Sequence, residues 1–149
     1  MSNAKEKFKL ICSSYLFLIK DNKILLGLRQ NTGYMDGFYS MPAGHKEEGE
    51  SVIDCLIREI KEEIGIDIDP KKARFVHVMH RKKEDERADF FFEVKEYGGD
   101  LQNMEPEKCA ELKWFNIDSL PQNTIPYIKQ AIECYQQGNF YSQFGWEEQ

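Results

Sequence analysis

Residues 44–66 read GHKEEGESVIDCLIREIKEEIGI, and this stretch organises the rest of the chain. Ser51 is a good helix N-cap, and Asp54, three residues later, completes a capping-box pattern. Gly65 can adopt the left-handed backbone conformation that commonly ends a helix. This punctuation predicts a helix that begins at Ser51 and ends at Gly65.

The predicted helix has two distinct faces. Its apolar side chains recur at helical spacing and predict a buried stripe, formed by Ile53, Leu56, Ile57, Ile60 and Ile64. Glu59, Glu62 and Glu63 are three and four residues apart, so they share a different face. Like charges at this spacing repel, but a hard divalent cation binds carboxylate oxygens and reverses that effect. The face is therefore interpreted as a metal site for phosphate chemistry, with a solvated acidic surface as the alternative.

The complete spacing is more specific than the glutamates alone. It runs as glycine, five residues, glutamate, seven residues, then Arg-Glu-apolar-x-Glu-Glu-x-Gly-apolar. At typical residue usage, a random match is on the order of 10⁻⁸ per starting position. Residues 44–66, called the box below, thus resemble the signature of the Nudix hydrolases without a departure, and the flanks resemble MutT-like members. The resemblance implies a Nudix fold of the α/β (α+β) class, an α/β/α sandwich with the box helix packed on a mixed sheet.

The resemblance also assigns roles within the box. It implies that Glu59, Glu62 and Glu63 are catalytic metal ligands, and that the carbonyl of Gly44 is a further ligand. Arg58 and Glu50 match residues that orient the carboxylates, and Arg58 can pair with Glu50 or with one of the trio. Mg²⁺ is the implied cofactor, with Mn²⁺ as a possible substitute. The general base is one of these glutamates or a loop glutamate, and the sequence does not choose between them.

A further carboxylate is expected in the loop that follows residue 101. Glu105 and Glu107 are both candidates for the additional metal ligand or base of many family members, and Glu105 is preferred. The alternative for either residue is an exposed loop glutamate.

Candidate substrate contacts lie outside the box. Arg29 and Arg87 are expected to contact phosphate, with a surface position as the alternative. Asn123 resembles a base-reading asparagine of MutT-like enzymes, although it also suits an Asx-type loop. Tyr34 is a candidate for stacking on a base, whereas Phe38 is expected in the core. The three histidines, His45, His77 and His80, lack metal-ligand spacing and are expected to be structural or exposed.

The leading functional hypothesis is Mg²⁺-dependent hydrolysis of a nucleoside triphosphate to a monophosphate and pyrophosphate. A nucleotide-sugar or ADP-ribose diphosphohydrolase is the alternative enzyme. A non-catalytic nucleotide-sensing module is the alternative class, but such a module would not need all three box glutamates.

Length and charge limit the remaining possibilities. The 149 residues suit one domain, 1–149, in which residues 1–6 are expected to be disordered or vector-encoded. The net charge of −6 argues against a nucleic-acid polymer as the main partner, and the family resemblance implies a small-molecule nucleotide as substrate. The four cysteines are scattered along the chain, which suggests reduced thiols in the cytoplasm: Cys12, Cys55, Cys109 and Cys134. No segment has the length of a membrane span. The family resemblance allows a monomer or a homodimer.

Apolar and aromatic runs predict the other elements. Strands are expected at 10–20, 23–28, 38–41, 73–81, 89–94 and 112–117, with a second helix at 126–138. A charged loop is expected at 82–87 and a turn at 97–100. The aromatic tail at 139–146 is expected to cover a core edge or a partner.

Overall fold

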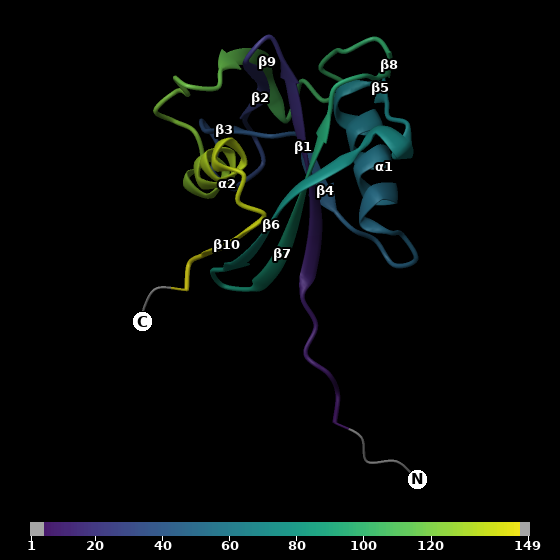
Figure 1. Cartoon of the computed structure of the whole chain (residues 1–149), viewed down its shortest axis with the longest axis vertical. Coiled ribbons are helices and arrows are strands. Elements are labelled where there is room, and N and C mark those ends of the chain that lie inside the picture. Colours follow the sequence, from purple (N-terminus) through teal and green to yellow (C-terminus); the bar gives the residue numbers. More distant parts are fainter. Residues whose placement is uncertain (1–4, 147–149) are drawn as a thin grey trace.

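A computed structural model of the chain describes residues 5–146, in which β1 (Ile11–Lys20) is the central strand. Residues 1–4 belong to the segment 1–6 that is expected to be disordered or vector-encoded, and they lie outside the described residues. Residues 5–10 form an exposed extended segment that leads away from the body of the molecule (Figure 1). The body therefore begins with β1, as the apolar run from residue 10 predicts.

β1 has neighbours on both sides. It pairs in parallel with β7 (Glu86–Val94) along most of its length, and antiparallel with β4 (Ala43–His45) near its start. Its far end forms a hairpin with β2 (Lys23–Arg29), which corresponds to the predicted strand 23–28, and Asp21 and Asn22 take positive φ values that suit a tight turn. On the side away from β7, β1 pairs first with β4 and then with β2, so its neighbour on that side changes along the strand.

The remaining strands extend this mixed sheet. β6 (Arg74–Lys82) pairs antiparallel with β7 and in parallel with β10 (Tyr141–Phe144). On the other side, β2 pairs antiparallel with β3 (Tyr39–Ser40) and β9 (Cys109–Asn116). The smaller elements are β5 (Ile66–Asp67), which pairs with β8 (Gly98–Gly99), and the 3₁₀ turn at Pro70–Lys72.

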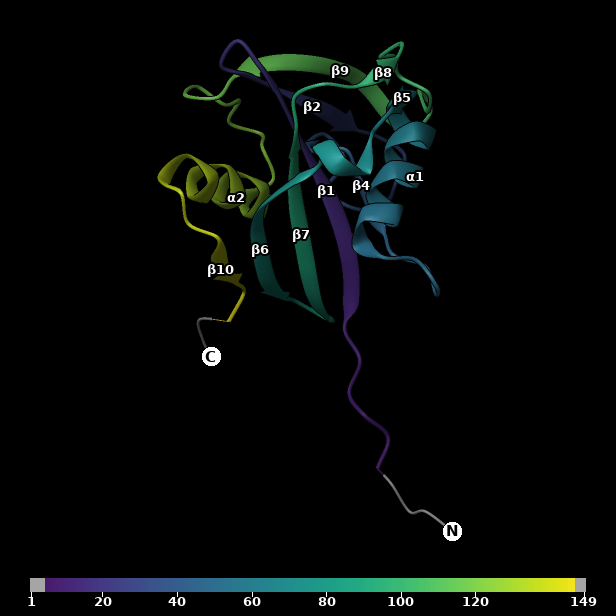
Figure 2. The ribbon, with the colours of Figure 1, turned by 45° about the vertical axis from the view of Figure 1, so that its right-hand side comes forward.

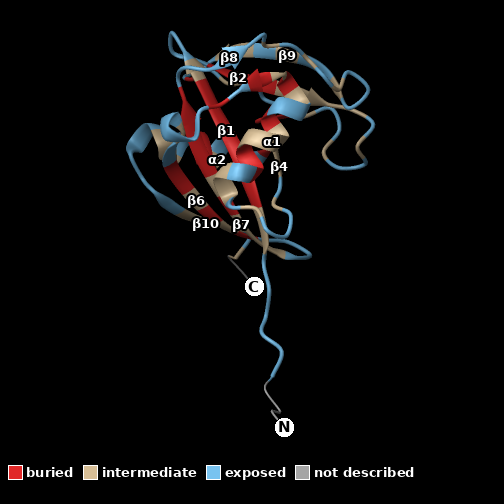
Figure 3. Cartoon of the chain, turned by 90° about the vertical axis from the view of Figure 1, so that its right-hand side faces the viewer, coloured by how far each residue is buried: buried red, intermediate tan, exposed pale blue. Residues whose placement is uncertain are grey.

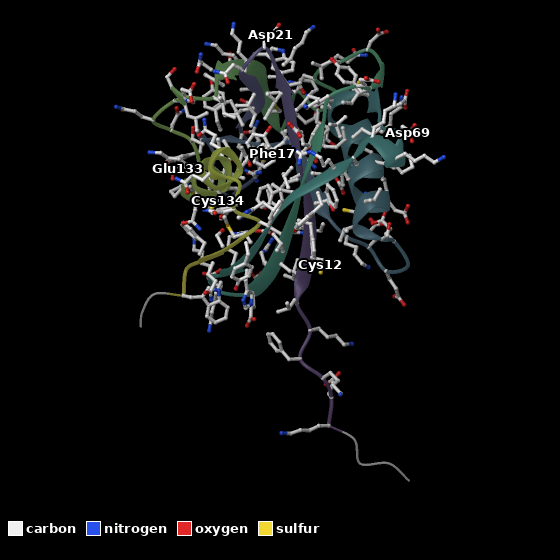
Figure 4. All side chains as sticks on the ribbon, viewed as in Figure 1. Cys12, Phe17, Asp21, Asp69, Glu133 and Cys134 are labelled. Carbon is white, nitrogen blue, oxygen red and sulfur yellow. The ribbon has the colours of Figure 1, made fainter. Side chains whose placement is uncertain are left out.

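Two helices cover opposite faces of the sheet. α1 (Val52–Ile64) lies on one face and α2 (Pro126–Gln137) on the other (Figure 2). Burial follows this division, since the buried strand residues lie between the two helices (Figure 3). Phe91 packs in the core beneath α2, whereas Phe92 packs in the core beneath α1, as expected for an aromatic run buried on both faces. Figure 4 places Phe17 between β1 and α2, where its ring stacks on Tyr135. The predicted α/β/α sandwich is confirmed.

The box helix is built as its sequence predicts. The Ser51 hydroxyl accepts a hydrogen bond from the Asp54 backbone, and the Asp54 carboxylate accepts one from the Ser51 backbone. Gly65 ends the helix with φ at 78°, a conformation that glycine adopts without strain. Leu56, Ile60 and Ile64 are fully buried, so the apolar stripe is the packed face.

Several predicted boundaries are wrong. β7 begins at Glu86, so the first part of the strand lies in the predicted charged loop 82–87. Cross-strand pairing with β6 explains this, because the polar residues at the end of a hairpin need no buried face. β9 begins three residues earlier than predicted, and the predicted turn at 97–100 contains β8. The aromatic tail contains β10, which covers the edge of the sheet.

The four cysteines are free thiols, as expected. Within residues 5–146, neither helix is long and apolar enough to cross a lipid bilayer.

Candidate active site

A cavity of about 800 Å³ opens where β4 leaves the side of β1. One part of its wall carries carboxylates from α1 and the loop before β9, and another carries basic and aromatic side chains. Several predicted site residues line it together: Arg29, Tyr34, Gly44, Glu59, Glu62, Glu63, Arg87 and Glu105. The fold thus brings residues from five separate segments to one place.

Gly44 and Glu59 are in close contact. A β-carbon on Gly44 would lie 2.0 Å from Glu59 Cδ, which no real structure tolerates. The Gly44 carbonyl accepts a hydrogen bond from the buried Cys55 thiol at 3.4 Å. The absence of a side chain at position 44 therefore lets the Glu59 carboxylate lie against β4, and any larger residue would displace that side chain.

Glu63 is the least accessible carboxylate of the trio. Its Oε1 accepts a hydrogen bond from the Ala43 backbone at 3.2 Å. Burial of this carboxylate, together with the negative charges of Glu59 and Glu105, raises its pKa well above the usual glutamate value. A cation beside Glu63 would relieve both effects.

Arg58 lies behind this cluster and holds two of its neighbours. Its Nε donates to Glu50 Oε2 at 2.5 Å, and its Nη1 donates to Glu59 Oε2 at 2.8 Å. Glu62 is more exposed, and its Oε1 lies 3.7 Å from Arg58 Nη1. The hydrogen bond from Arg58 lowers the pKa of Glu50 to about 2. The sequence offered Glu50 or a member of the trio as the partner of Arg58, and Arg58 in fact bonds to both Glu50 and Glu59.

The donor chemistry fits a hard divalent cation. Carboxylate oxygens of Glu59 and Glu63 lie beside the Gly44 and Ala43 backbone, and burial together with like charge raises the pKa of Glu63. Within residues 5–146, however, no three carboxylate, histidine or thiol side chains form a ready-made metal-binding group. Glu62 faces solvent, and Arg58 occupies an oxygen of Glu59. The described conformation therefore supplies the ligands without assembling them.

Glu105 lies in the cavity wall, whereas the Glu107 side chain does not. Burial, followed by the charges of nearby glutamates that include Glu59 and Glu62, raises the pKa of Glu105. Glu107 is exposed, and its backbone carbonyl accepts a hydrogen bond from Asn31. Of the two predicted loop candidates, only Glu105 is positioned to join the carboxylates.

Arg29 and Tyr34 belong to a tightly bonded loop. Arg29 Nε donates to the Tyr34 carbonyl at 2.8 Å, and Arg29 Nη2 donates to Thr32 Oγ1 at 3.0 Å. The Tyr34 ring lies between two cations, with Arg29 5.5 Å and Lys83 5.6 Å from its centroid. Arg29 thus organises the loop and leaves only part of its guanidinium for a ligand.

Arg87 lies on the basic part of the wall. Its Nη1 donates to His45 Nε2 at 2.9 Å, while its Nε is bound to Asp85. His45 is exposed at the cavity, whereas His77 is buried and bonds to the Asn139 carbonyl and Ser142. The expected structural role is therefore found for His77.

The structure does not bring Asn123 into the wall of this cavity. Its side-chain nitrogen donates to the Gly37 carbonyl at 2.9 Å, and its own carbonyl accepts from the Tyr39 backbone. This geometry favours the loop alternative, in which Asn123 ties the segment before α2 to the loop that carries Tyr34.

Several cavity residues were not among the predicted site residues. Arg81 is buried, donates to Asp89 Oδ2 at 2.7 Å, and lies 3.8 Å from the centroid of the Tyr127 ring. Further lining residues that were not predicted include Ser13, Tyr15, Lys83 and Lys108. Asp89 was a sequence signal for a residue such as Arg81. It lies next to the apolar run of its strand, and a carboxylate that is buried there needs a charged partner.

Comparison with known proteins now identifies the class. The NUDIX domain family model matches residues 13–135, which include β1, the box and most of α2. The chain belongs to the NUDIX domain family, as the box predicts.

The more specific comparisons are with individual proteins. The chain is 30% identical over 129 residues to a protein named NAD-capped RNA hydrolase NudC from Stutzerimonas stutzeri (strain A1501), covering 83% of this chain and 41% of that protein. It is 36% identical over 113 residues to a protein named ADP-ribose pyrophosphatase from Methanocaldococcus jannaschii, covering 74% of this chain and 64% of that protein. The chain thus spans less than two thirds of the length of these curated relatives.

A solved structure shows the same fold. The MutT NUDIX hydrolase from Burkholderia pseudomallei superposes with a TM-score of 0.77 at 24% identity. The match covers 85% of this chain and 98% of that chain.

Proposed function

We propose that this protein hydrolyses a diphosphate bond in a nucleoside diphosphate-linked substrate and requires a divalent cation. The observation that carries the proposal is the placement of Glu59 against Gly44 and of Glu63 on the Ala43 backbone, in a cavity that also contains basic side chains. Carboxylates suit the cation, and the basic side chains suit the phosphates.

Residues of the chain divide the work in this proposal. Glu59, Glu62 and Glu63 hold Mg²⁺ or Mn²⁺, with the Gly44 carbonyl as a further ligand, and Arg58 with Glu50 orients Glu59. A divalent cation held by these residues would supply positive charge to the phosphates and would lower the pKa of the attacking water. Glu105 is a candidate to accept the proton of that water, because it lies in the same wall. Arg29, Arg87 and Lys83 counter the phosphate charge, and Tyr34 presents an aromatic face to the ligand.

For the substrate class, we propose a nucleoside diphosphate joined to a second group such as ribose. Support comes from the two named relatives, whose names describe ADP-ribose and an NAD cap. A nucleoside triphosphate, cleaved to the monophosphate and pyrophosphate, is the second candidate. The basic residues along the cavity favour it, because a triphosphate carries more charge that needs a counterion.

A substrate panel tests the proposal. ADP-ribose, nucleotide sugars, dinucleotides, NTPs and dNTPs would be incubated with Mg²⁺ or Mn²⁺, and the phosphorus-containing products would be identified. We expect diphosphate cleavage that EDTA abolishes and that excess Mg²⁺ restores. Full activity in excess chelator, or no cleavage of any compound in the panel, would contradict it.

A further inference from the structure

A row of polar side chains crosses the sheet beside the carboxylates. In the strand registers, Ser13 of β1 lies opposite His45 of β4 on one side and opposite Asp89 of β7 on the other. Directly opposite residues point to the same face of a sheet, so these three side chains form one row. The row lies on the face that α2 covers, because Tyr15, two residues from Ser13, packs against Tyr127 of α2.

Two oxygens in this row have no hydrogen-bond partner. Ser13 Oγ and Asp89 Oδ1 are both buried, and nothing in residues 5–146 bonds to either atom. The other oxygen of Asp89 is satisfied, since it accepts from Arg81 Nε at 2.7 Å. Buried polar atoms without a partner destabilise a fold, and native proteins contain few of them. Two on neighbouring strands indicate that a partner from outside the chain binds there.

The unpaired Ser13 oxygen belongs to a residue of the cavity wall. Ser13, Tyr15, Arg81 and Tyr127 line the same cavity as Glu59 and Glu63. The cavity volume of about 800 Å³ is in the range of small-molecule sites, so a nucleotide bound beside the carboxylates would share this cavity with Ser13. Asp89 does not line the cavity itself, but it is bonded to Arg81, which does.

Ser13 is not placed as a nucleophile. Its hydroxyl lacks a hydrogen bond to any described base, and the ring nitrogen Nε2 of His45 is taken by Arg87. The oxygen is therefore available for recognition.

We propose that Ser13 Oγ and Asp89 Oδ1 determine base specificity by binding the exocyclic amino group of a nucleobase. An amino group has two N–H bonds and can donate one to each oxygen. The carboxylate oxygen accepts only, while Arg81 fixes the carboxylate by bonding its other oxygen. This inference rests on the proposed function, because it assumes that the cavity binds a nucleotide.

The test measures nucleotide binding without turnover. Titration calorimetry in the presence of Mg²⁺ would compare AMP with purine riboside monophosphate, and GMP with IMP, because each pair differs by one amino group. Ser13→Ala removes the proposed contact. Ser14→Ala is the matched control, since Ser14 is also buried but already donates to the Val52 carbonyl at 2.6 Å.

We expect the wild-type protein to bind the amino-bearing nucleotide of at least one pair more tightly, by about two- to tenfold for each of the two proposed hydrogen bonds. Ser13→Ala should lower that ratio by about two- to tenfold, because only the contact with Asp89 remains, and Ser14→Ala should leave it unchanged. No discrimination by the wild type, or an unchanged ratio in Ser13→Ala, would overturn the proposal. The second result would mean that an ordered water is the partner of these oxygens.

Thermal unfolding provides an independent readout. Ser13→Ala should not lower the melting temperature, because it removes a buried group without a partner, whereas Ser14→Ala should lower it. Asp89 is left unchanged in these tests, because its replacement would leave the buried Arg81 without a counter-charge. Binding can discriminate between bases even if no diphosphate is hydrolysed, so failure of the proposed function and failure of this inference give different results.

Discussion

The aromatic end of the cavity and its carboxylate end differ in how they accommodate a carboxylate: Asp89 is buried beside the aromatic end, and Glu63 is partly buried in the wall of the carboxylate end. Asp89 is paired with Arg81 on the neighbouring strand, and the Tyr127 ring covers that guanidinium. Glu63 has no ion pair within the described residues, and its nearest charges are the carboxylates of Glu59 and Glu105. A buried charge is costly unless something pairs with it. At the aromatic end the charges are paired but two oxygens, Ser13 Oγ and Asp89 Oδ1, have no hydrogen bond, whereas at the carboxylate end Arg58 pairs with Glu59 and the charge of Glu63 stays unpaired among the described residues.

The largest expected effect comes from Glu63→Gln, which removes the unpaired charge. We expect turnover to fall by about 10²- to 10⁴-fold, in the range of losing a group that acts on the reacting water or its cation. Thermal unfolding should show a fold that is at least as stable, because the substitution removes a carboxylate whose raised pKa reports an unfavourable charge.

Glu48→Gln is the matched control, since Glu48 is an exposed box glutamate that does not line the cavity. Product release by both variants would be measured in Mg²⁺ with the best substrate of the panel. Equal rates for Glu63→Gln and wild type would remove Glu63 from the catalytic assignment.

At the aromatic end, the expected loss is in stability. Arg81→Gln leaves Asp89 buried without its counter-charge, which typically costs about 3–5 kcal/mol. Denaturant unfolding of Arg81→Gln, Asp89→Asn and the double variant would form a double-mutant cycle. The free energy of unfolding should fall less in the double variant than the sum of its decreases in the two single variants. Additive losses would show that the pair contributes little as a unit.

Gly44→Ala tests how closely the carboxylate end depends on geometry. The new methyl group would occupy the position of Glu59 Cδ, so the Glu59 side chain must move. A displacement of this size can cost about 10²-fold in rate while the helix remains packed. Gly98→Ala is the control, because the nearest atom to its added carbon is Asp67 Cβ at 3.7 Å. A rate within twofold of wild type would mean that the position of Glu59 is unimportant.

Arg58 gives a smaller effect that depends on pH. Because its hydrogen bond lowers the pKa of Glu50 from 4.5 to about 2, the folded state favours ionised Glu50. This stabilisation is complete above the ordinary glutamate pKa and disappears as the pH falls towards 2. Arg58→Gln should therefore lower the melting temperature at pH 6 more than at pH 2.5.

Arg58→Lys is the companion variant, because lysine keeps the charge but cannot form the two-pronged contact with Glu50. Melting temperatures would be compared across that pH range. If the difference in melting temperature between wild type and Arg58→Gln stays constant from pH 6 to 2.5, the pairing of Arg58 with Glu50 is contradicted.

The carboxylate end could be read from the sequence because its information is local. Ser51, Asp54 and Gly65 fix the limits of α1, and the helical period alone places Glu59, Glu62 and Glu63 on one face. Even the contact of Arg58 with Glu50 joins residues only eight positions apart. The proximity of Gly44 to Glu59 depends on how β4 packs against α1, which no local pattern predicts. The family resemblance nevertheless assigned both residues to one site.

The aromatic end could not be read in this way, because its contacts join distant parts of the chain. Tyr15 and Tyr127 are 112 positions apart, and their hydroxyl groups meet only when α2 folds over β1. Ser13 lies beside Asp89 because β1 and β7 are parallel neighbours, a pairing that no local pattern specifies. β10 was missed for the same reason, since its partner β6 precedes it by more than fifty residues.

The smallest expected effect separates two interpretations of Asn123. Its amide tethers the Gly37 carbonyl and lies outside the cavity wall, so Asn123→Ala should lower stability by about 0.5–1.5 kcal/mol, the range of one hydrogen bond. We expect the preference among bases to stay as in wild type, in contrast to Ser13→Ala. The measurement is the same panel of monophosphates, with a denaturant unfolding curve for each variant. A changed base preference in Asn123→Ala, with unchanged stability, would restore the base-reading role and would move the specificity contacts from the strands of the sheet to the loop before α2.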